Sequence, residues 1–307
     1  MANIPHLTAP ALRYFIEVSK CGSISLASSH LNVATSAISR QISGLEEQLG
    51  TPLFERRPRG MVLSAAGEML AAYARKVLLE TDRVLAEIKD LEGLQQGKVS
   101  IACTEGFAME YLPVCIAQFQ RQYTQIQFKI DVYPPAHVSD AIRNGDADIG
   151  VTFSLNPSPD INVAFRQPAP ILAIMAPNHP LAHKKSVSLS QIAAYPLALP
   201  YRDTTVRQLF DICASRQQLA IEPAFTGSYI AALTQYTIHS GGISLFGEIS
   251  VRNLVKEQRL VALPIRDRGM DIRNIEVQTL MGRTLPKAVD VFLGFLIQSL
   301  PGENELK

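Results

Sequence analysis

Four isoleucine and leucine residues between residues 35 and 49 recur at a spacing that one face of an α-helix produces. They lie at i, i+4, i+7 and i+11: Ile38, Ile42, Leu45 and Leu49. Shorter helical patterns precede this stripe at residues 7–22 and 25–32, the second with Ser25 as its expected N-cap, and a tight break follows at Asn32. Two short helices and a longer one, joined in this way, predict a helix-turn-helix unit.

The face of the third helix opposite this stripe carries small hydroxyl side chains and one arginine. These residues are Thr35, Ser36, Ser39 and Arg40, all near the N-terminal end of the helix. Short side chains allow a helix end to approach DNA closely, and hydroxyl groups can bond phosphates or base edges. Arg40 adds a longer, positively charged side chain to this face. We therefore expect this face to contact DNA.

Residues 51–64 contain two short extended runs around an Arg-Pro-Arg-Gly turn, which predicts a small β-wing. Three arginines lie within four positions of this segment: Arg56, Arg57 and Arg59. A solvated charged hairpin is the alternative interpretation. Because the segment directly follows a helix-turn-helix unit, a wing that contacts phosphates or the minor groove is the better hypothesis.

From Ser64 to about Gln96 the sequence has the length and periodicity of one long helix. Apolar residues recur along it at seven-residue spacing, with one more at an intervening position. Because the flanking residues are charged, we expect this stripe to pair two copies of the helix as a coiled coil rather than to pack inside a globular core. The predicted dimerisation residues are Leu70, Val77, Val84, Ile88 and Leu91.

Apolar strand-like runs alternate with helical patterns from residue 97 onward. A β-α-β-α-β order covers residues 97–154, the alternation restarts with "PILAIMAP", and one more strand and helix follow near the C-terminus. Such alternation predicts an α/β fold with parallel sheets and helices on both of their faces. Two similar α/β lobes with a ligand cleft between them form the simplest architecture.

Composition narrows the class of protein further. A length of 307 residues suggests about two domains, and a hydrophobic content of 47% indicates packed cores. With a net charge of +1, any nucleic-acid contact must be concentrated in a local patch. Neither a membrane span nor a signal-peptide pattern is found, so a cytoplasmic protein without membrane contact is expected. The four cysteines show no CxxC and no histidine at ligand spacing, so no metal or cofactor is expected.

Five stretches, in this order and spacing, resemble LysR-type transcriptional regulators over essentially the full chain: "LRYFIEVSKCGSISLAS", "AISRQISGLEEQLG", "PLFERRPRGMVLSAAGE", "LPVCIAQFQRQY" and "GDADIGVTF". The resemblance implies a homodimer or homotetramer, with DNA, a small effector and RNA polymerase as partners. It also implies three regions, the last similar to type 2 periplasmic binding proteins. These are a winged helix-turn-helix at 1–63, a dimerising linker helix at 64–96, and an effector-binding domain at 97–307, with lobe one at 97–166 and 268–307 and lobe two at 167–267.

The resemblance also identifies one departure in the DNA-contacting helix. Members of the family commonly carry Ser-Gln followed by Pro or Ser where this chain has Ala34, Thr35 and Ser36. A base-reading glutamine is therefore missing. The family's Ser-Arg pair matches Ser39 and Arg40, and its wing arginine matches Arg56.

Family ligands bind between the lobes, near strand ends and helix N-termini. Thr104 follows the first strand of lobe one, and Thr204 and Ser228 lie where helices of lobe two are expected to begin. Helix N-termini with hydroxyl groups suit an anion, so a carboxylate-bearing effector is the hypothesis. Each hydroxyl has the alternative role of merely capping its helix. The candidate effector-binding residues are Thr104, Glu105, Thr152, Phe153, Ser154, Tyr201, Thr204, Thr205, Ser228 and Phe246.

The sequence thus predicts a DNA-binding transcriptional regulator that is controlled by a small effector, with an organic acid as the favoured class. A ligand-binding module or solute-binding-like protein without direct gene regulation is the alternative. An enzyme is not expected, since GxSxG, P-loop, HExxH and strand-linked GxGxxG motifs are all missing. His179 and His183 lie four residues apart, but they fall in a loop-forming Asn-His-Pro context without a third ligand.

Overall fold

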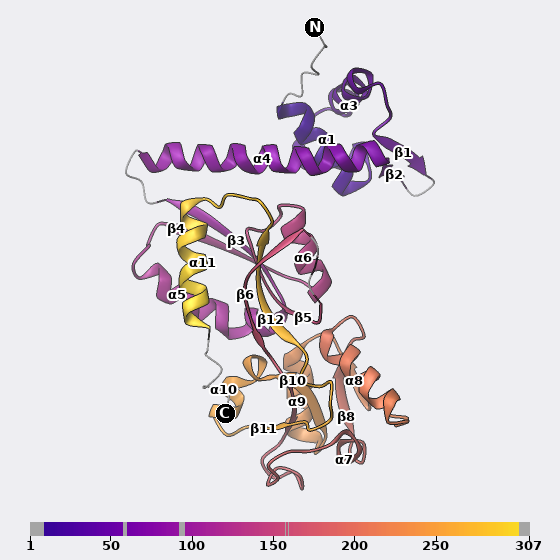
Figure 1. The fold of residues 1–307 in the computed structure, drawn as a ribbon, viewed down its shortest axis with the longest axis vertical. Coiled ribbons are helices and arrows are strands. Elements are labelled where there is room, and N and C mark those ends of the chain that lie inside the picture. Colours follow the sequence, from indigo (N-terminus) through magenta and orange to yellow (C-terminus); the bar gives the residue numbers. More distant parts are fainter. Residues whose placement is uncertain (1–8, 58–59, 92–95, 157, 159, 301–307) are drawn as a thin grey trace. The chain divides into compact units, whose positions relative to one another are not determined.

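The chain divides into two units, Met1–Glu92 and Gly93–Lys307 (Figure 1). Each unit has hydrophobic cores of its own. A computed structural model describes residues 9–57, 60–91, 96–156, 158 and 160–300. Within these ranges no helix combines the length and the apolar character that crossing a membrane requires. Strands and helices of the second unit form two α/β lobes.

The first unit is a three-helix core followed by a two-stranded antiparallel wing and a long helix. Its elements are α1 (Ala9–Cys21), α2 (Ile24–Leu31), α3 (Thr35–Leu49), β1 (Phe54–Arg57), β2 (Gly60–Leu63) and α4 (Ala65–Leu91). The apolar stripe of α3 supplies Ile38, Ile42 and Leu45 to the core, where they join Phe15 of α1. Gly50 ends α3 in the left-handed conformation, with φ of 66°.

The start of α2 differs from the expectation. Ser23, not Ser25, is the N-cap, and its hydroxyl accepts a hydrogen bond from the backbone N–H of Leu26 at 3.4 Å. Both serines are suitable N-caps. Gly22, with a positive φ of 64°, ends α1, so the next residue, Ser23, can already cap a new helix. Ile24 thus belongs to the helix.

The long helix α4 uses its apolar stripe in two ways along its length. Leu70 is buried in the core of the first unit, and Val77 packs against the same core. This half of α4 packs against the protomer's own α1, and the pairing of Leu70 and Val77 with a second copy stays a prediction. Val84 and Ile88 are exposed and remain available. Leu91 ends the helix, and its side chain lies outside the described residues.

Lobe one of the second unit is built on a five-stranded mixed sheet in the order β4-β3-β5-β12-β6. Helices α5 and α11 pack on one face of this sheet and α6 packs on the other. The elements are β3 (Gly97–Cys103), the π-helix η1 (Phe107–Tyr111), α5 (Leu112–Gln120), β4 (Ile126–Val132), α6 (Pro135–Arg143), β5 (Ile149–Ser154), β6 (Ile161–Pro168), β12 (Asn274–Leu280) and α11 (Lys287–Ser299).

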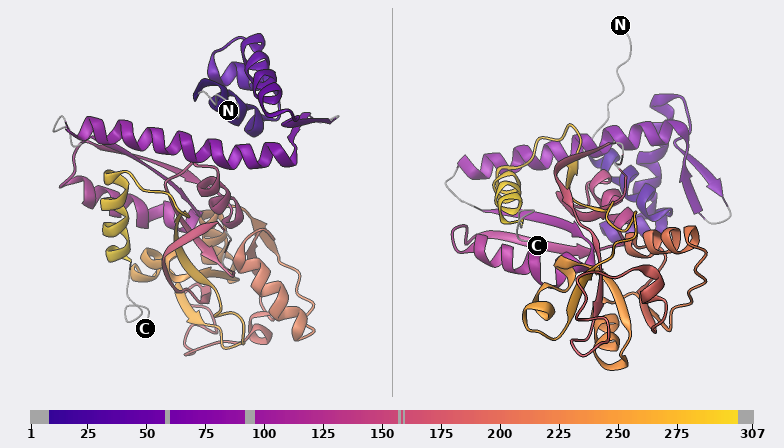
Figure 2. Two further views of the ribbon diagram at one scale, coloured as in Figure 1. Left: turned by 45° about the horizontal axis from the view of Figure 1, so that its top comes forward. Right: turned by 60° about the horizontal axis from the view of Figure 1, so that its bottom comes forward.

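Lobe two has a second five-stranded sheet, in the order β11-β7-β10-β8-β9. Helices α7 and α8 cover one face, and α9 and α10 the other (Figure 2). The elements are β7 (Ile171–Met175), α7 (Leu189–Ile192), β8 (Leu197–Pro200), α8 (Thr205–Arg216), β9 (Phe225–Gly227), α9 (Ile230–Ser240), β10 (Ile243–Gly247), the 3-10 helix η2 (Glu248–Ser250), α10 (Arg252–Lys256) and β11 (Val261–Pro264).

The sheets are mixed, which corrects the expectation of purely parallel sheets. Strand β3 pairs in parallel with β4 and β5, but β12 runs antiparallel between β5 and β6. Strands β6 and β11 were not anticipated. Both are edge strands with partly exposed residues, and they lack the continuous apolar run that marks a central strand. Through β12 the last part of the chain returns to lobe one.

Candidate functional site

A cavity of about 480 Å³ lies between the two lobes of the second unit. Lobe one contributes residues after the C-terminal ends of β3 and β4 and from within β5. Lobe two contributes residues from the ends of β8, β9 and β10 and from the starts of α8 and α9. We call it the interlobe cavity. Its volume falls in the range of about 300–1,000 Å³ that small-molecule sites occupy.

Most of the candidate effector-binding residues line the interlobe cavity. Those that do are Thr104, Glu105, Phe153, Tyr201, Thr204, Thr205, Ser228 and Phe246. Thr152 and Ser154 of β5 do not line it. Because successive side chains of a strand alternate between its two faces, these two neighbours of Phe153 point away from the cavity. Thr152 is buried and its hydroxyl donates to the carbonyl of Phe153 at 3.4 Å, whereas Ser154 donates to the carbonyl of Asn156 at 2.7 Å.

Thr204 shows that the capping alternative holds for at least one hydroxyl. Its Oγ1 accepts from the backbone N–H of Arg207 at 3.3 Å and donates to the carbonyl of Tyr201 at 2.8 Å. Thr204 is the N-cap of α8, so its hydroxyl is engaged within its own chain segment. It contributes to the cavity wall more than to ligand hydrogen bonding.

Arg273, which sequence reasoning missed, is the strongest polar feature of the interlobe cavity. The residue is 1% exposed, its Nε donates to the carbonyl of Ala169 at 3.0 Å, and its guanidinium carbon lies 4.0 Å from the centre of the Phe153 ring. Burial lowers the pKa of Arg273 to about 9, which leaves the side chain protonated at neutral pH. Among the described residues, its Nη2 has no hydrogen-bond partner.

A glycine makes room for this guanidinium. A Cβ atom at Gly247 would lie 2.3 Å from Nη2 of Arg273, so any larger residue there would displace the arginine. Gly247 ends β10 in lobe two, whereas Arg273 immediately precedes β12 in lobe one. No local pattern in the sequence links these two positions, and for that reason the arginine could not be found from the sequence.

Thr104 offers a second donor in the same cavity. It follows β3, its backbone N–H donates to the carbonyl of Val151 at 3.1 Å, and its side chain is 7% exposed. Its Oγ1 has no partner within the described part of the chain. A buried hydroxyl without a hydrogen bond costs about 1–3 kcal/mol, so a ligand that bonds it recovers this free energy.

Glu105 joins the two lobes across the cavity. Its two carboxylate oxygens accept from the backbone N–H of Ile230 at 3.0 and 3.1 Å. Tyr229, the N-cap of α9, makes no side-chain cap, so a glutamate from lobe one fills that role. Burial raises the pKa of Glu105, although the bond from Ile230 acts in the opposite direction. The first backbone N–H of α9, close to Ser228, is thus bonded within the chain, and an anionic ligand at this helix start stays a prediction.

The first unit brings together the residues expected to contact DNA. Thr35, Ser36, Ser39 and Arg40 are all exposed on α3, while Ile38 between them is buried. Ala34, the N-cap of α3, makes no side-chain hydrogen bond. The N-terminal N–H groups of α3 are thus free of a side-chain cap, and such groups bind phosphate well.

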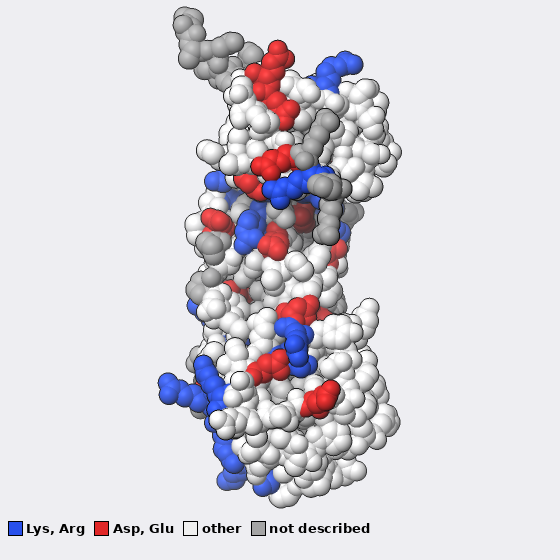
Figure 3. Space-filling view, turned by 90° about the vertical axis from the view of Figure 1, so that its right-hand side faces the viewer, with Lys and Arg blue, Asp and Glu red and all other residues white. Residues whose placement is uncertain are grey.

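The arginines of the wing are only partly described. Arg57 is exposed and forms an ion pair with Glu55, with 2.9 Å between Nη2 and Oε2. Only the backbone of Arg56 is described, in β1, and Arg59 lies outside the described residues. On the face shown in Figure 3, basic and acidic side chains lie close together at several places, whereas a group of basic side chains at the lower left edge has no acidic ones among it.

Two family models match the chain, one for each of its two units. Residues 10–68 match a family described as "Bacterial regulatory helix-turn-helix protein, lysR family", and residues 92–301 match "LysR substrate binding domain". Among curated relatives, the uncharacterized regulator YdcI of Escherichia coli is 24% identical over 94% of this chain and 95% of its own length. The transcriptional dual regulator GltC of Bacillus subtilis is 32% identical over 64% of this chain and 67% of its own length.

Solved structures share the fold. A full-length OxyR variant from Pseudomonas aeruginosa has a TM-score of 0.70 at 18% identity and covers 95% of both chains. Full-length CbnR complexed with its target DNA has a TM-score of 0.57 at 18% identity, covering 95% of this chain and 100% of its own. The effector-binding domain of QuiR in complex with shikimate has a TM-score of 0.55 at 18% identity, covering 66% and 96%.

Proposed function

We propose that this chain, which belongs to the LysR family of bacterial transcriptional regulators, binds a small organic acid between its lobes and thereby controls its DNA contacts. DNA-binding transcriptional regulation is the function of this family. The alternative of a ligand-binding module without gene regulation is not favoured, because the helix-turn-helix match covers residues 10–68. We propose the cytoplasm as its location and RNA polymerase as a further partner.

The observation that carries the choice of an acid is the unpaired Nη2 of Arg273 in the interlobe cavity. A buried cation without a counter-charge is costly, and a carboxylate offers both the charge and the acceptor that it lacks. Thr104 adds a second unpaired donor. Glu105 does not satisfy this need, since its carboxylate is engaged with the backbone N–H of Ile230.

The remaining wall of the cavity favours an acid with an apolar body. Phe153, Phe246 and Tyr201 line it, together with Val132 and Leu233. A volume of about 480 Å³ accommodates a ring or a medium-sized chain. Shikimate, the ligand named for QuiR, is a cyclic carboxylic acid and supports this class without identifying the effector here.

DNA binding is proposed to occur through the exposed N-terminal face of α3. Support comes from the exposure of Thr35, Ser39 and Arg40, from the uncapped start of the helix, and from the DNA complex of the fold relative CbnR. For assembly, we propose that the exposed Val84, Leu85 and Ile88 of α4 pair two copies as a homodimer or within a homotetramer. A monomer in sedimentation of the full chain at micromolar concentration would contradict this.

The experiment that tests the function measures fluorescence anisotropy of the full chain on the DNA upstream of its own gene. A panel of aromatic and alicyclic carboxylic acids is titrated alongside the corresponding primary amides. We expect at least one acid, and none of the amides, to change the affinity for DNA, because only the acid neutralises Arg273. No response to any acid, or an equal response to acids and amides, would contradict the proposed effector class.

Arg40→Ala is expected to weaken binding to this DNA by about 1–3 kcal/mol, roughly 5- to 150-fold, if the guanidinium contacts a base edge. Arg121→Ala removes another exposed arginine, from the second unit, and serves as the control, with expected binding equal to that of the parent. Parent-like binding of Arg40→Ala over a range of salt concentrations would remove α3 from the interface.

A further inference from the structure

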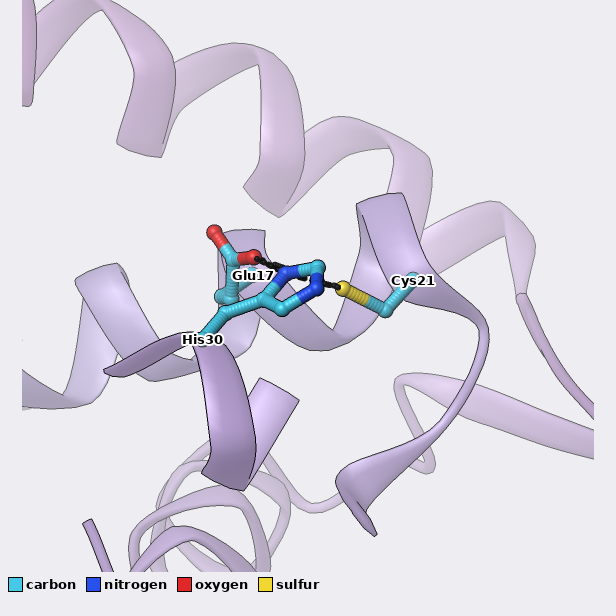
Figure 4. Close-up of side chains that lie close together, drawn as sticks. All are labelled: Glu17, Cys21 and His30. Carbon is cyan, nitrogen blue, oxygen red and sulfur yellow. Dashed lines mark hydrogen bonds and ion pairs between the residues drawn. The ribbon is translucent and has the colours of Figure 1, made fainter. Parts of the chain in front are cut away.

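Three side chains with metal-binding atoms converge at the junction of α1 and α2 (Figure 4). Glu17 and Cys21 lie four residues apart on α1 and therefore share one face of that helix. His30, in the last turn of α2, faces them. Nδ1 of His30 lies 2.8 Å from Oε1 of Glu17 and 3.4 Å from Sγ of Cys21, and Sγ lies 3.3 Å from the same Oε1.

We propose that Glu17, Cys21 and His30 bind a divalent transition-metal ion of the Zn²⁺ class. Around a tetrahedral Zn²⁺ with bonds of about 2.3 Å to sulfur and 2.0–2.1 Å to nitrogen and oxygen, the nitrogen and oxygen lie about 3.3–3.4 Å apart and each lies about 3.5–3.6 Å from the sulfur. Both separations that involve the sulfur are within about 0.3 Å of this spacing. The Nδ1–Oε1 separation must widen most, by about 0.5 Å, for the ion to enter.

The surroundings allow an ion to enter and to keep an exchangeable ligand. The side chain of His30 is 59% exposed and that of Glu17 is 23% exposed. One sulfur, one imidazole nitrogen and one carboxylate oxygen form a borderline-soft donor set, which suits Zn²⁺ better than Mg²⁺ or Ca²⁺. With three protein ligands, the fourth position of the tetrahedron is left to water.

The charges at the cluster act on a metal in opposite directions. Burial and the hydrogen bond to Glu17 raise the pKa of the Cys21 thiol, so a metal must displace the thiol proton in order to bind the sulfur. Burial acts to raise the pKa of Glu17, but hydrogen bonds with His30 and Cys21 bring it below its usual value, so the carboxylate is ionised. The positive charge of Lys20 also lowers the pKa of Glu17, and the same charge repels a bound cation. A bound metal would itself lower the thiol pKa and hold the thiolate as its ligand.

Occupation of this site would cross-link α1 to α2 beside the turn that precedes α3. His30 is two residues from Asn32, the left-handed residue that ends α2. Because α1 and α2 both pack on α3, a metal bridge between them would stabilise the part of the fold that presents Thr35 and Arg40. The site is chemically separate from the interlobe cavity, so its test does not depend on the proposed effector.

The experiment titrates the reduced full chain with Co²⁺, a spectroscopic substitute for Zn²⁺. We expect a thiolate-to-Co²⁺ charge-transfer band in the near ultraviolet, visible bands typical of tetrahedral Co²⁺, saturation at one ion per chain, and loss of all bands on addition of Zn²⁺. Cys21→Ser should abolish the charge-transfer band. His30→Gln should weaken Co²⁺ binding at least 10-fold, whereas His183→Gln, an exposed histidine of the second unit, should bind like the parent.

Two results would overturn the proposal. One is a parent chain that gives no thiolate band in excess Co²⁺, and the other is a band that persists unchanged in Cys21→Ser. Circular dichroism establishes that each variant keeps its helical content. If Cys21→Ser loses helical content, His30→Gln decides, because its side chain is mostly exposed: an unchanged Co²⁺ affinity in that variant would equally overturn the site.

Discussion

Arg273→Met is expected to reduce the affinity for the acid that controls DNA binding by about 2–5 kcal/mol, which is roughly 30-fold to several thousand-fold. The substitution removes the buried Nη2 donor and its charge, and the flexible methionine side chain fills much of the same volume. Isothermal titration calorimetry of the full chain with that acid measures the effect. Thr104→Val should weaken the same binding by a smaller amount, about 1–3 kcal/mol, because it removes one neutral donor.

The unfolding midpoint of Arg273→Met shows whether a loss of acid binding comes from the missing arginine or from a damaged fold. The guanidinium of Arg273 is desolvated and compensated only by Ala169 and the Phe153 ring among the described contacts, so its loss is expected to leave the unfolding midpoint unchanged or raised. Arg202→Met is the matched control, since Arg202 is exposed and does not line the cavity. An Arg273→Met protein that binds the acid as tightly as the parent would disprove the role of this arginine.

Asp148→Ala is expected to lower the free energy of unfolding of the second unit by about 3–5 kcal/mol. Its Oδ1 accepts from Nη2 of Arg283 at 2.7 Å and its Oδ2 accepts from the backbone N–H of Ser100 at 2.8 Å. The side chain of Arg283 is 8% exposed, and its Nε and Nη1 have no partners among the described residues. Removal of the carboxylate would therefore leave a buried, uncompensated cation.

Urea unfolding of the full chain, followed by far-ultraviolet circular dichroism, measures this change. Asp140→Ala is the control, since it breaks the partly exposed ion pair with Arg143 on α6 and should cost less than about 1 kcal/mol. The double variant Asp148→Ala, Arg283→Met should recover much of the loss, because no charge is then buried. Equal midpoints for Asp148→Ala and Asp140→Ala would show that the buried pair contributes no more than a surface pair.

Local periodicity was enough to identify α3 and its two faces. A 3.6-residue repeat places Ile38, Ile42 and Leu45 on one side of a helix, which leaves Thr35 and Arg40 on the other, whatever the rest of the chain does. Apolar runs also located the strands and helices next to Thr104, Tyr201 and Ser228, and the family resemblance then implied that these ends face a ligand between the lobes. Such features depend only on residues close together in the chain.

Tertiary structure alone decided how those features are used. Leu70 belongs to a seven-residue repeat, but α1 covers it, so it is a core residue of its own protomer. Glu105 occupies the start of α9 from the opposite lobe, and Gly247 of β10 makes room for Arg273 beside β12. The convergence of His30 with Glu17 and Cys21 also requires the packing of α2 on α1. Periodicity reports which way a side chain points along its own element, whereas these contacts depend on which other element the fold brings against that side chain.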